Sequence, residues 1–138
     1  MPPLFSKLNL STQKTIFVLD PPQSFQPHLL QLAGINIVDH LEAEHELNFI
    51  IIFVTQKNHI DQIALALAKN AAGDAIVWFA YPKATSKKYR CDFNRDTGWD
   101  TFKILGFDTV RQVAIDEDWS ALRFRRVEFI GARAAARQ

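Results

Sequence analysis

The sequence predicts an α/β fold of the three-layer, Rossmann-like kind, built on a mostly parallel six-stranded sheet. Short apolar runs alternate along the chain with segments whose apolar residues recur at helical spacing. The run FIIIFV at 49–54 has no polar alternation, which is typical of a central strand covered by helices on both faces. With 138 residues, 48% of them apolar, the chain has room for one packed core, so we expect residues 1–138 to form a single domain.

The first strand and helix are predicted from their boundary residues. The strand at 15–20 must stop at Pro21 and Pro22, because neither proline has an N–H group to donate to a sheet. A short helix should follow, with Ser24 as its N-cap and Gly34 at its end. These residues predict the first β–α unit.

The middle of the chain should contain two more strands and the best-specified helix. A second strand is expected at 35–39, and the apolar run 49–54 is the third. The next helix should begin at Asn58 as N-cap and end before Gly73, since the apolar residues between them fall on one helical face.

The C-terminal half should add three strands and one helix. A fourth strand is predicted at 75–81, followed by a polar loop and a helix with Asp96 as its N-cap. Strands at 110–115 and 120–127 are separated by an acidic turn, which is short enough for an antiparallel pair. The sheet should therefore contain one reversed strand at its C-terminal end.

Composition places the protein in a broad class. The 16 Lys and Arg residues nearly balance the 15 Asp and Glu residues, so the overall charge implies no polyanionic partner. The N-terminus lacks the pattern of a signal peptide, and no apolar run is long enough to cross a membrane. Cys91 is the single cysteine, which excludes an intrachain disulfide. We expect a soluble cytoplasmic protein with no membrane partner.

The candidate ligand site is the segment 81–96, which follows the fourth predicted strand. Lysines and free N–H groups in such a loop can bind an anion, although the Walker spacing is absent and a solvated loop has a similar composition. We assign no catalytic residue and no cofactor. We also assign no metal site, because His40 and Glu44 at i, i+4 spacing lack a third ligand. The predicted ligand-binding residues are Tyr81, Lys83, Thr85, Ser86, Lys87, Asn94, Arg95 and Trp119.

Three motifs in this order carry a resemblance to a known family. They are YPKATSKK at 81–88, DFNRDTGWD at 92–100 and DEDWSALRFR at 116–125. The chain resembles the bacterial domain-of-unknown-function family 3052 from KLNL at 7–10 through the last motif. The resemblance implies a complete domain and brings no catalytic residue with it. The basic tail at 131–138 extends past the recurring segment, and whether it is ordered stays open.

A more distant similarity is to the sheet of class I methyltransferases, shortened by one β–α unit. It implies the strand order 2-1-3-4-6-5. Such enzymes need glycines after the first strand, and here Pro21 and Pro22 remove N–H donors, which disfavours a backbone cradle for adenosylmethionine or a nucleotide. Asp39 stands about 20 residues beyond the first strand, as a ribose-binding acid would. Without the glycines, we favour a strand-terminating residue that faces water.

Three classes of function remain open. We favour a non-catalytic binding or regulatory module that uses segment 81–96 for a small anionic ligand or a protein partner. The alternative is a degenerate or atypical methyltransferase-like enzyme in which Asp20, Asp39 and Lys83 converge at the strand ends. The second alternative is a nucleic-acid accessory protein that binds through its C-terminal arginines, although arginines that protect a sheet edge from aggregation are a simpler explanation. The arginines in question are Arg123, Arg125, Arg126, Arg133 and Arg137. Whether the protein forms a homo-oligomer also stays open.

Overall fold

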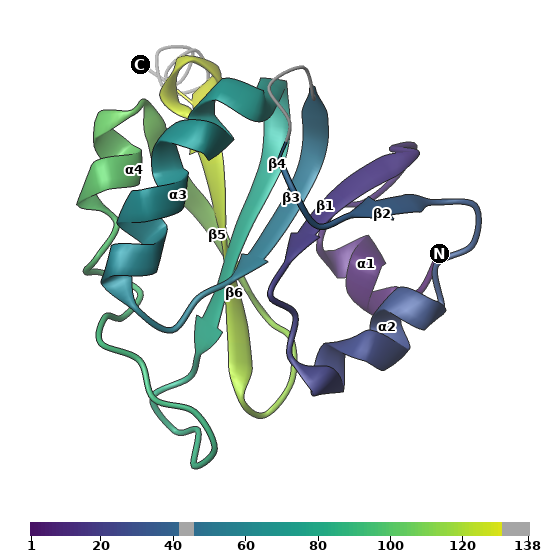
Figure 1. Cartoon of the computed structure of the whole chain (residues 1–138), viewed down its shortest axis with the longest axis horizontal. Helices are drawn as coiled ribbons and strands as arrows, with labels where there is room; N and C mark the ends of the chain where they lie inside the picture. The colour runs from purple at the N-terminus through teal and green to yellow at the C-terminus, as the bar shows by residue number, and fades with distance from the viewer. Residues whose placement is uncertain (42–45, 131–138) are drawn as a thin grey trace.

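The computed structural model describes residues 1–41 and 46–130, which form one six-stranded sheet with helices on both faces (Figure 1). The strands are β1 (Thr15–Leu19), β2 (Asn36–Val38), β3 (Leu47–Phe53), β4 (Ala71–Pro82), β5 (Phe107–Ala114) and β6 (Trp119–Arg126). The helices are α1 (Pro3–Lys7), the 3-10 turn η1 (Gln23–Phe25), α2 (Gln26–Leu30), α3 (Lys57–Asn70) and α4 (Asp100–Ile104).

The strand order β2-β1-β3-β4-β6-β5 confirms the predicted topology. Strands β2, β1, β3 and β4 are parallel to one another. Strand β6 is antiparallel to both β4 and β5, between which it lies. The carboxyl ends of β1, β3 and β4 therefore meet at one edge of the sheet, where α/β proteins of this kind bind ligands.

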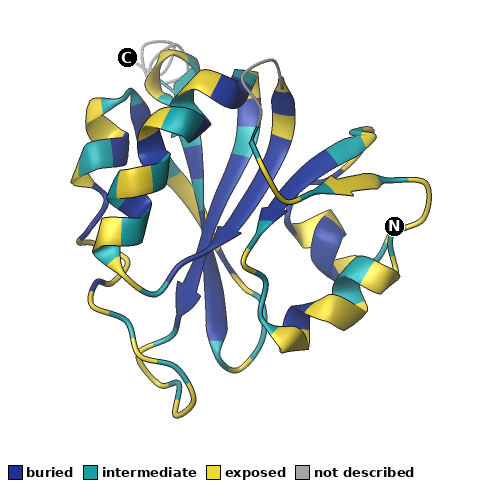
Figure 2. Ribbon diagram, viewed as in Figure 1, coloured by how far each residue is buried: buried dark blue, intermediate teal, exposed yellow. Residues whose placement is uncertain are grey.

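The central strands are buried on both faces, as the apolar run in β3 predicts. Helices α3 and α4 cover one face, and α1 and α2 cover the other (Figure 1). Ile50 and Ile52 pack into the core under α3, whereas Ile51 and Phe53 pack into the core on the opposite face. Figure 2 shows these strands buried along nearly their full length.

Helix α1 was not predicted from the sequence. It begins at Pro3 after a proline and buries Leu4 and Phe5. The indole N–H of Trp78 in β4 donates to the carbonyl oxygen of Leu8 at 2.8 Å, which ties the end of the helix to the middle of the sheet. A proline followed by apolar residues at helical spacing was the signal available in the sequence.

Several strand boundaries also differ from prediction. Strand β4 begins at Ala71, directly after α3, and its pairing with β3 shifts register between Leu47 and Phe49. A β-bulge of this kind adds residues to one strand, and periodicity alone does not show it. The antiparallel turn between β5 and β6 is confirmed, and Asp116 Oδ1 accepts from the N–H groups of Asp118 and Trp119, both at 2.8 Å.

The three predicted N-caps are wrong. Ser24 donates its hydroxyl to Asp116 Oδ2 at 3.3 Å, Asp96 donates its N–H to the side chain of Asn94, and Asn58 lies inside α3. The N–H of Lys57 instead donates to Asp92 Oδ1 at 2.7 Å. A carboxylate from the loop after β4 thus caps α3 from a distant part of the sequence, where local reasoning does not look for a cap.

Removing this long-range cap should destabilise the protein. We expect Asp92→Ala to lower the free energy of unfolding by about 1 kcal/mol, because α3 loses the acceptor for one of its first N–H groups. Asp96→Ala is the matched control, since Asp96 is an exposed aspartate in the same loop that caps no helix. Urea unfolding followed by circular dichroism measures both, and equal stabilities of the two variants would show that the cap contributes nothing.

Within the described residues, no helix has the length and apolar character needed to cross a membrane. The basic tail at 131–138 lies outside the described residues.

Candidate functional site

The loop that follows β4 is anchored on the turn between β5 and β6. The N–H of Lys83 donates to the carbonyl oxygen of Asp118 at 2.8 Å. The hydroxyl of Ser86 donates to Asp118 Oδ1 at 2.8 Å, and the same oxygen of Ser86 accepts from the N–H of Tyr89. These bonds hold the first half of the loop against the sheet, so the cleft behind it has a defined wall.

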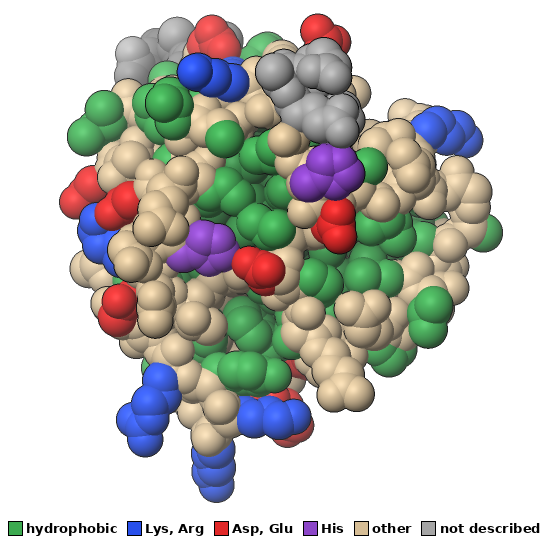
Figure 3. Space-filling model, in the orientation of Figure 1, with side chains coloured by type: hydrophobic (Ala, Val, Ile, Leu, Met, Phe, Trp, Pro, Cys, Tyr) green, Lys and Arg blue, Asp and Glu red, His purple; other side chains and the backbone are tan. Residues whose placement is uncertain are grey.

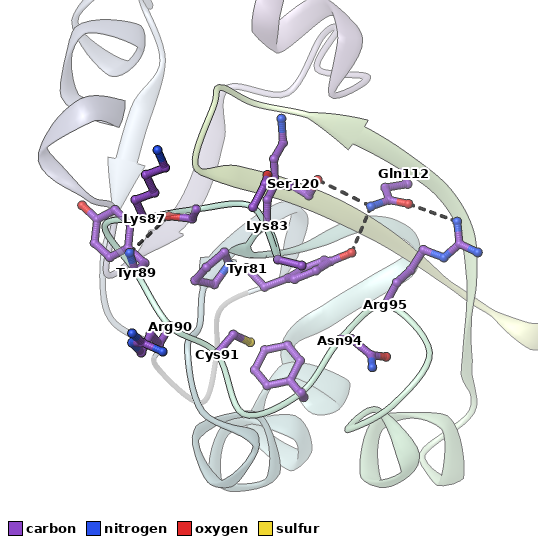
Figure 4. Close-up of a pocket in the computed structure, with 15 residues that line it drawn as sticks. Tyr81, Lys83, Lys87, Tyr89, Arg90, Cys91, Asn94, Arg95, Gln112 and Ser120 are labelled. Carbon is purple, nitrogen blue, oxygen red and sulfur yellow. Dashed lines mark hydrogen bonds between the residues drawn. The ribbon is translucent and has the colours of Figure 1, made fainter.

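A cleft of about 950 Å³ lies between this loop, the end of β4 and the strands β5 and β6 (Figure 4). All the predicted ligand-binding residues except Trp119 line it. They are Tyr81, Lys83, Thr85, Ser86, Lys87, Asn94 and Arg95. The sequence predicted that these residues share one site, and they do line one cleft. Their role in ligand binding stays a prediction.

The structure adds lining residues that sequence reasoning missed. Tyr89, Arg90 and Cys91 belong to the same loop, whereas Gln112 and Ser120 come from β5 and β6. The alternation of side chains along β6 explains why Ser120 was missed and why Trp119 was wrongly assigned to the cleft. Successive strand residues face opposite sides, so Ser120 faces the cleft while Trp119 points away from it.

Trp119 is therefore not a residue of this cleft. It is 3% exposed and packs on the opposite face of the sheet. Its ring centroid lies 5.2 Å from that of Phe53 and 4.9 Å from that of Tyr89. Trp119 supports the loop from behind by holding the ring of Tyr89.

Tyr81 is the central polar group of the cleft. Its hydroxyl oxygen accepts from Gln112 Nε2 at 3.0 Å, and Gln112 Oε1 accepts from Arg95 Nη1 at 3.4 Å (Figure 4). Burial raises the pKa of Tyr81. The phenol is therefore protonated and neutral at neutral pH.

The raised pKa of Tyr81 predicts a loss of stability in alkaline solution. Its folded-state pKa lies above the unfolded value of about 10, so the folded state holds the proton more tightly. This contribution is fully present below pH 10 and is lost as the pH rises through the folded pKa. We expect Tyr81→Phe to show a shallower decline in the free energy of unfolding between pH 9 and 11, measured by urea unfolding. Parallel pH profiles of the two proteins would contradict the assignment.

Cys91 lies in the cleft but is not set up as a nucleophile. It is half-buried, and burial raises the pKa of its thiol. A thiol with a raised pKa stays protonated at neutral pH and reacts slowly. The structure gives no reason to assign it a catalytic role.

Of the three residues proposed to converge in the enzyme alternative, only Lys83 lines the cleft. Asp20 Oδ2 lies 3.7 Å from His59 Nε2, and Asp39 Oδ1 lies 3.2 Å from His40 Nδ1. Lys83 lines the cleft, which includes neither carboxylate in its lining. Glu44, considered with His40 as a metal ligand, lies outside the described residues. Among residues 1–41 and 46–130, no three metal-ligating side chains come together.

The arginines of β6 make contacts within the protein. Arg125 donates two hydrogen bonds to the carboxylate of Asp74, at 2.8 and 2.6 Å. Arg126 donates to the carbonyl oxygens of Ala68 and Ala71, and its guanidinium lies 4.7 Å above the ring of Phe107. These contacts join β6 to the α3–β4 connection, and nucleic-acid binding by these arginines stays an alternative drawn from the sequence alone. Arg133 and Arg137 lie outside the described residues.

Comparison with known proteins identifies the fold. No family model matches the chain, and no curated protein matches it. N-methyltransferase NodS from Bradyrhizobium japonicum WM9 superposes with a TM-score of 0.55 and 14% identity, over 89% of this chain and 92% of that chain. The same enzyme in complex with S-adenosyl-l-homocysteine gives a TM-score of 0.56 and 13% identity, over 89% and 83% of the two chains. A SAM-dependent methyltransferase from Aquifex aeolicus gives 0.61 and 10% identity, over 89% and 87%.

These similarities establish that the chain has the fold of class I, SAM-dependent methyltransferases. They also correct our first interpretation. A non-catalytic binding module was the favoured function, and it is wrong in view of these matches, which span most of this chain and favour the methyltransferase-like alternative.

Proposed function

We propose that the protein is an atypical methyltransferase-like enzyme that binds S-adenosylmethionine with few backbone contacts. The observation that carries the proposal is the sheet. Its order β2-β1-β3-β4-β6-β5, with β6 reversed, belongs to a fold shared with SAM-dependent methyltransferases over most of the chain. Because identity to these enzymes is low, the activity has to be argued from the residues of this chain.

The turn after β1 keeps one feature of a cofactor loop and lacks another. Asp20 has a φ of +54°, which is a left-handed conformation. Glycine adopts this conformation most often, and aspartate adopts it more readily than most other residues. The chain therefore bends as it leaves β1. Pro21 and Pro22 follow it, so this stretch has no N–H donors and no glycine over which a ligand could approach the backbone. The loop fits the methionine end of the cofactor poorly.

The end of β2 fits the ribose end of the cofactor better. Val38 pairs with Phe17 in the parallel ladder between β2 and β1, and Asp39 follows directly at the carboxyl end of the strand. The carboxylate of Asp39 is 86% exposed, and beside its contact with His40 Nδ1 it has room to accept hydrogen bonds from a pair of sugar hydroxyls. We expect Asp39 to be the main polar contact to the cofactor.

Within this proposal, the cleft behind the loop after β4 binds the methyl acceptor. Bound S-adenosylmethionine supplies a methyl group on a positively charged sulfur, which a nucleophilic atom of an acceptor takes up. The chain contributes the carboxylate of Asp39 to hold the cofactor and the cleft around Tyr81 to orient the acceptor. Residues Tyr81, Lys83 and Arg95 are then substrate-binding residues.

Calorimetric titration of S-adenosylmethionine into the full chain tests the proposal. We expect saturable binding with one site per chain, and Asp39→Ala should weaken it roughly 10-fold, because a charge-assisted hydrogen bond contributes about 1.5–3 kcal/mol. Asp108→Ala is the matched control, since it removes an exposed aspartate from β5 at the far edge of the sheet.

The controls separate a specific site from weak attraction to any charge. Asp108→Ala should bind S-adenosylmethionine like the unaltered protein. If millimolar S-adenosylmethionine produces no binding heat, or if both aspartate variants bind equally well, the proposed function is wrong.

Two expectations from the sequence accompany this proposal. Membership of the domain-of-unknown-function family 3052 rests on the three motifs quoted above. A cytoplasmic location rests on the single cysteine, which fits a reducing compartment.

A further inference from the structure

The hydrogen bonds around Tyr81 fix which way its hydroxyl proton can point. Arg95 has donors only, so the atom of Gln112 that faces it must be the oxygen. The NH₂ group of Gln112 then faces Tyr81 and donates to the phenolic oxygen. With that oxygen acting as acceptor, the Tyr81 proton is left free to donate to a molecule in the cleft (Figure 4).

Tyr81 is also held rigidly in this position. The residue is 5% exposed, and its ring packs against Phe93 and Trp99 with centroid distances of 5.9 Å to each. A buried hydroxyl whose proton has no partner among the described residues is costly unless a ligand or water accepts it. The geometry therefore supplies a preorganised neutral donor in the wall of the cleft.

The charges around the cleft point to the kind of group that would accept this proton. Lys83, Lys87, Arg90 and Arg95 line the cleft, and none of its lining residues is an aspartate or glutamate. Arg95 lies 3.6 Å from the exposed carboxylate of Asp96, which leaves its Nη1 pointing to Gln112. Basic side chains also gather at the lower end of the face in Figure 3, where the loop after β4 lies in Figure 1.

We propose that this cleft binds an oxyanion of the acceptor substrate, a carboxylate or a phosphate, with Tyr81 and Arg95 as its donors. That this oxyanion belongs to a methyl acceptor rests on the proposed function. The binding of the oxyanion itself can be tested without the cofactor. Tyr81 and Arg95 then determine which substrates enter, because a neutral molecule of the same shape offers no negative charge to the basic side chains of the cleft.

Titrations of the full chain, followed by ¹H–¹⁵N NMR at constant ionic strength, test this inference. The probes are inorganic phosphate and acetate, with acetamide as the uncharged control. We expect saturable shifts of the Tyr81 and Arg95 amides with at least one of the two anions and none with acetamide. The anion that binds identifies whether a phosphate or a carboxylate is preferred.

Two variants that each remove a donor, one variant that adds a negative charge and one control variant make the test specific. Tyr81→Phe and Arg95→Gln should each weaken binding of the preferred anion roughly 10-fold, and Lys69→Gln, an exposed lysine at the end of α3, should leave it unchanged. Gln112→Glu should also weaken it, because a carboxylate there accepts the Tyr81 proton and neutralises Arg95.

The outcomes separate this inference from the proposed function. Failure of both anions to bind, or equal binding by Tyr81→Phe, Arg95→Gln and Lys69→Gln, would overturn the oxyanion site even if S-adenosylmethionine binds. Anion binding that depends on Tyr81 would support the site even if the cofactor does not bind.

Discussion

Replacing Trp99 with Ala should remove roughly 3–5 kcal/mol from the free energy of unfolding, the typical cost of truncating a buried aromatic residue. Trp99 is 1% exposed, and its ring lies 5.4 Å from that of Phe79 and 5.1 Å from that of Phe124. Its indole N–H donates to the carbonyl oxygens of Asn94 and Arg95, at 2.9 and 3.1 Å. The substitution thus leaves a cavity and also releases the loop that holds Arg95 in the cleft.

Trp99→Phe separates these two effects. It keeps much of the ring packing but loses the N–H donor, so it should be less destabilising than Trp99→Ala. We expect an intermediate midpoint in thermal unfolding, together with broadened NMR signals from residues 94–97. A midpoint for Trp99→Ala within a degree or two of the unaltered protein would show that this ring is not part of the core.

A second large effect is expected at Gly98, where both backbone conformation and space require glycine. Its φ is +93°, and a Cβ added there would lie 2.7 Å from the Cβ of Phe93, closer than real Cβ atoms approach. The left-handed conformation alone costs of order 1–3 kcal/mol for another residue. We expect Gly98→Ala to exceed that cost, because Phe93 lines the cleft and must shift to make room.

Gly106 provides the matched control for Gly98. Its φ of +99° is nearly the same, but an added Cβ meets nothing within 4 Å. Gly106→Ala should therefore show the backbone strain without the clash, and only Gly98→Ala should displace the NMR signals of the cleft. Urea unfolding measures both variants, and equal losses of stability would mean that the contact with Phe93 costs nothing.

The strands could be predicted from sequence because their signals are local, whereas their order in the sheet was implied by the similarity to class I methyltransferases. The unbroken apolar run ending at Val54 indicated a strand buried on both faces, and the prolines after Asp20 marked a strand end. The acidic turn at Asp116 predicted the reversed pair. Each of these signals depends on neighbours in sequence, so no knowledge of distant contacts was needed.

The errors concern interactions between residues far apart in sequence. Asp92 caps α3 from the loop after β4, and nothing near Lys57 indicates it. The cleft was located through its polar loop, whereas Gln112 was missed because it approaches from β5. Trp119 was assigned to the site as an aromatic residue at a strand end, although strand alternation directs it to the other face.

The functional error has a related cause. The prolines after β1 argued against a backbone cradle, and the favoured module rested on a lysine-bearing loop in a chain without a catalytic motif. The left-handed conformation of Asp20 shows that the chain bends after β1 as a glycine would allow, although Pro21 and Pro22 provide no N–H donors. A local departure from a motif thus changes how a ligand is held. The sheet topology determines where the fold provides a ligand site.

The most direct test of the central claim is a ¹H–¹⁵N NMR titration of the full chain with S-adenosylhomocysteine. The account predicts saturable shifts at the amides of Asp20, Asp39 and His40, which lie at the carboxyl ends of β1 and β2. Shifts confined to the loop after β4, or no shifts at millimolar concentration, would contradict a cofactor site at this edge of the sheet.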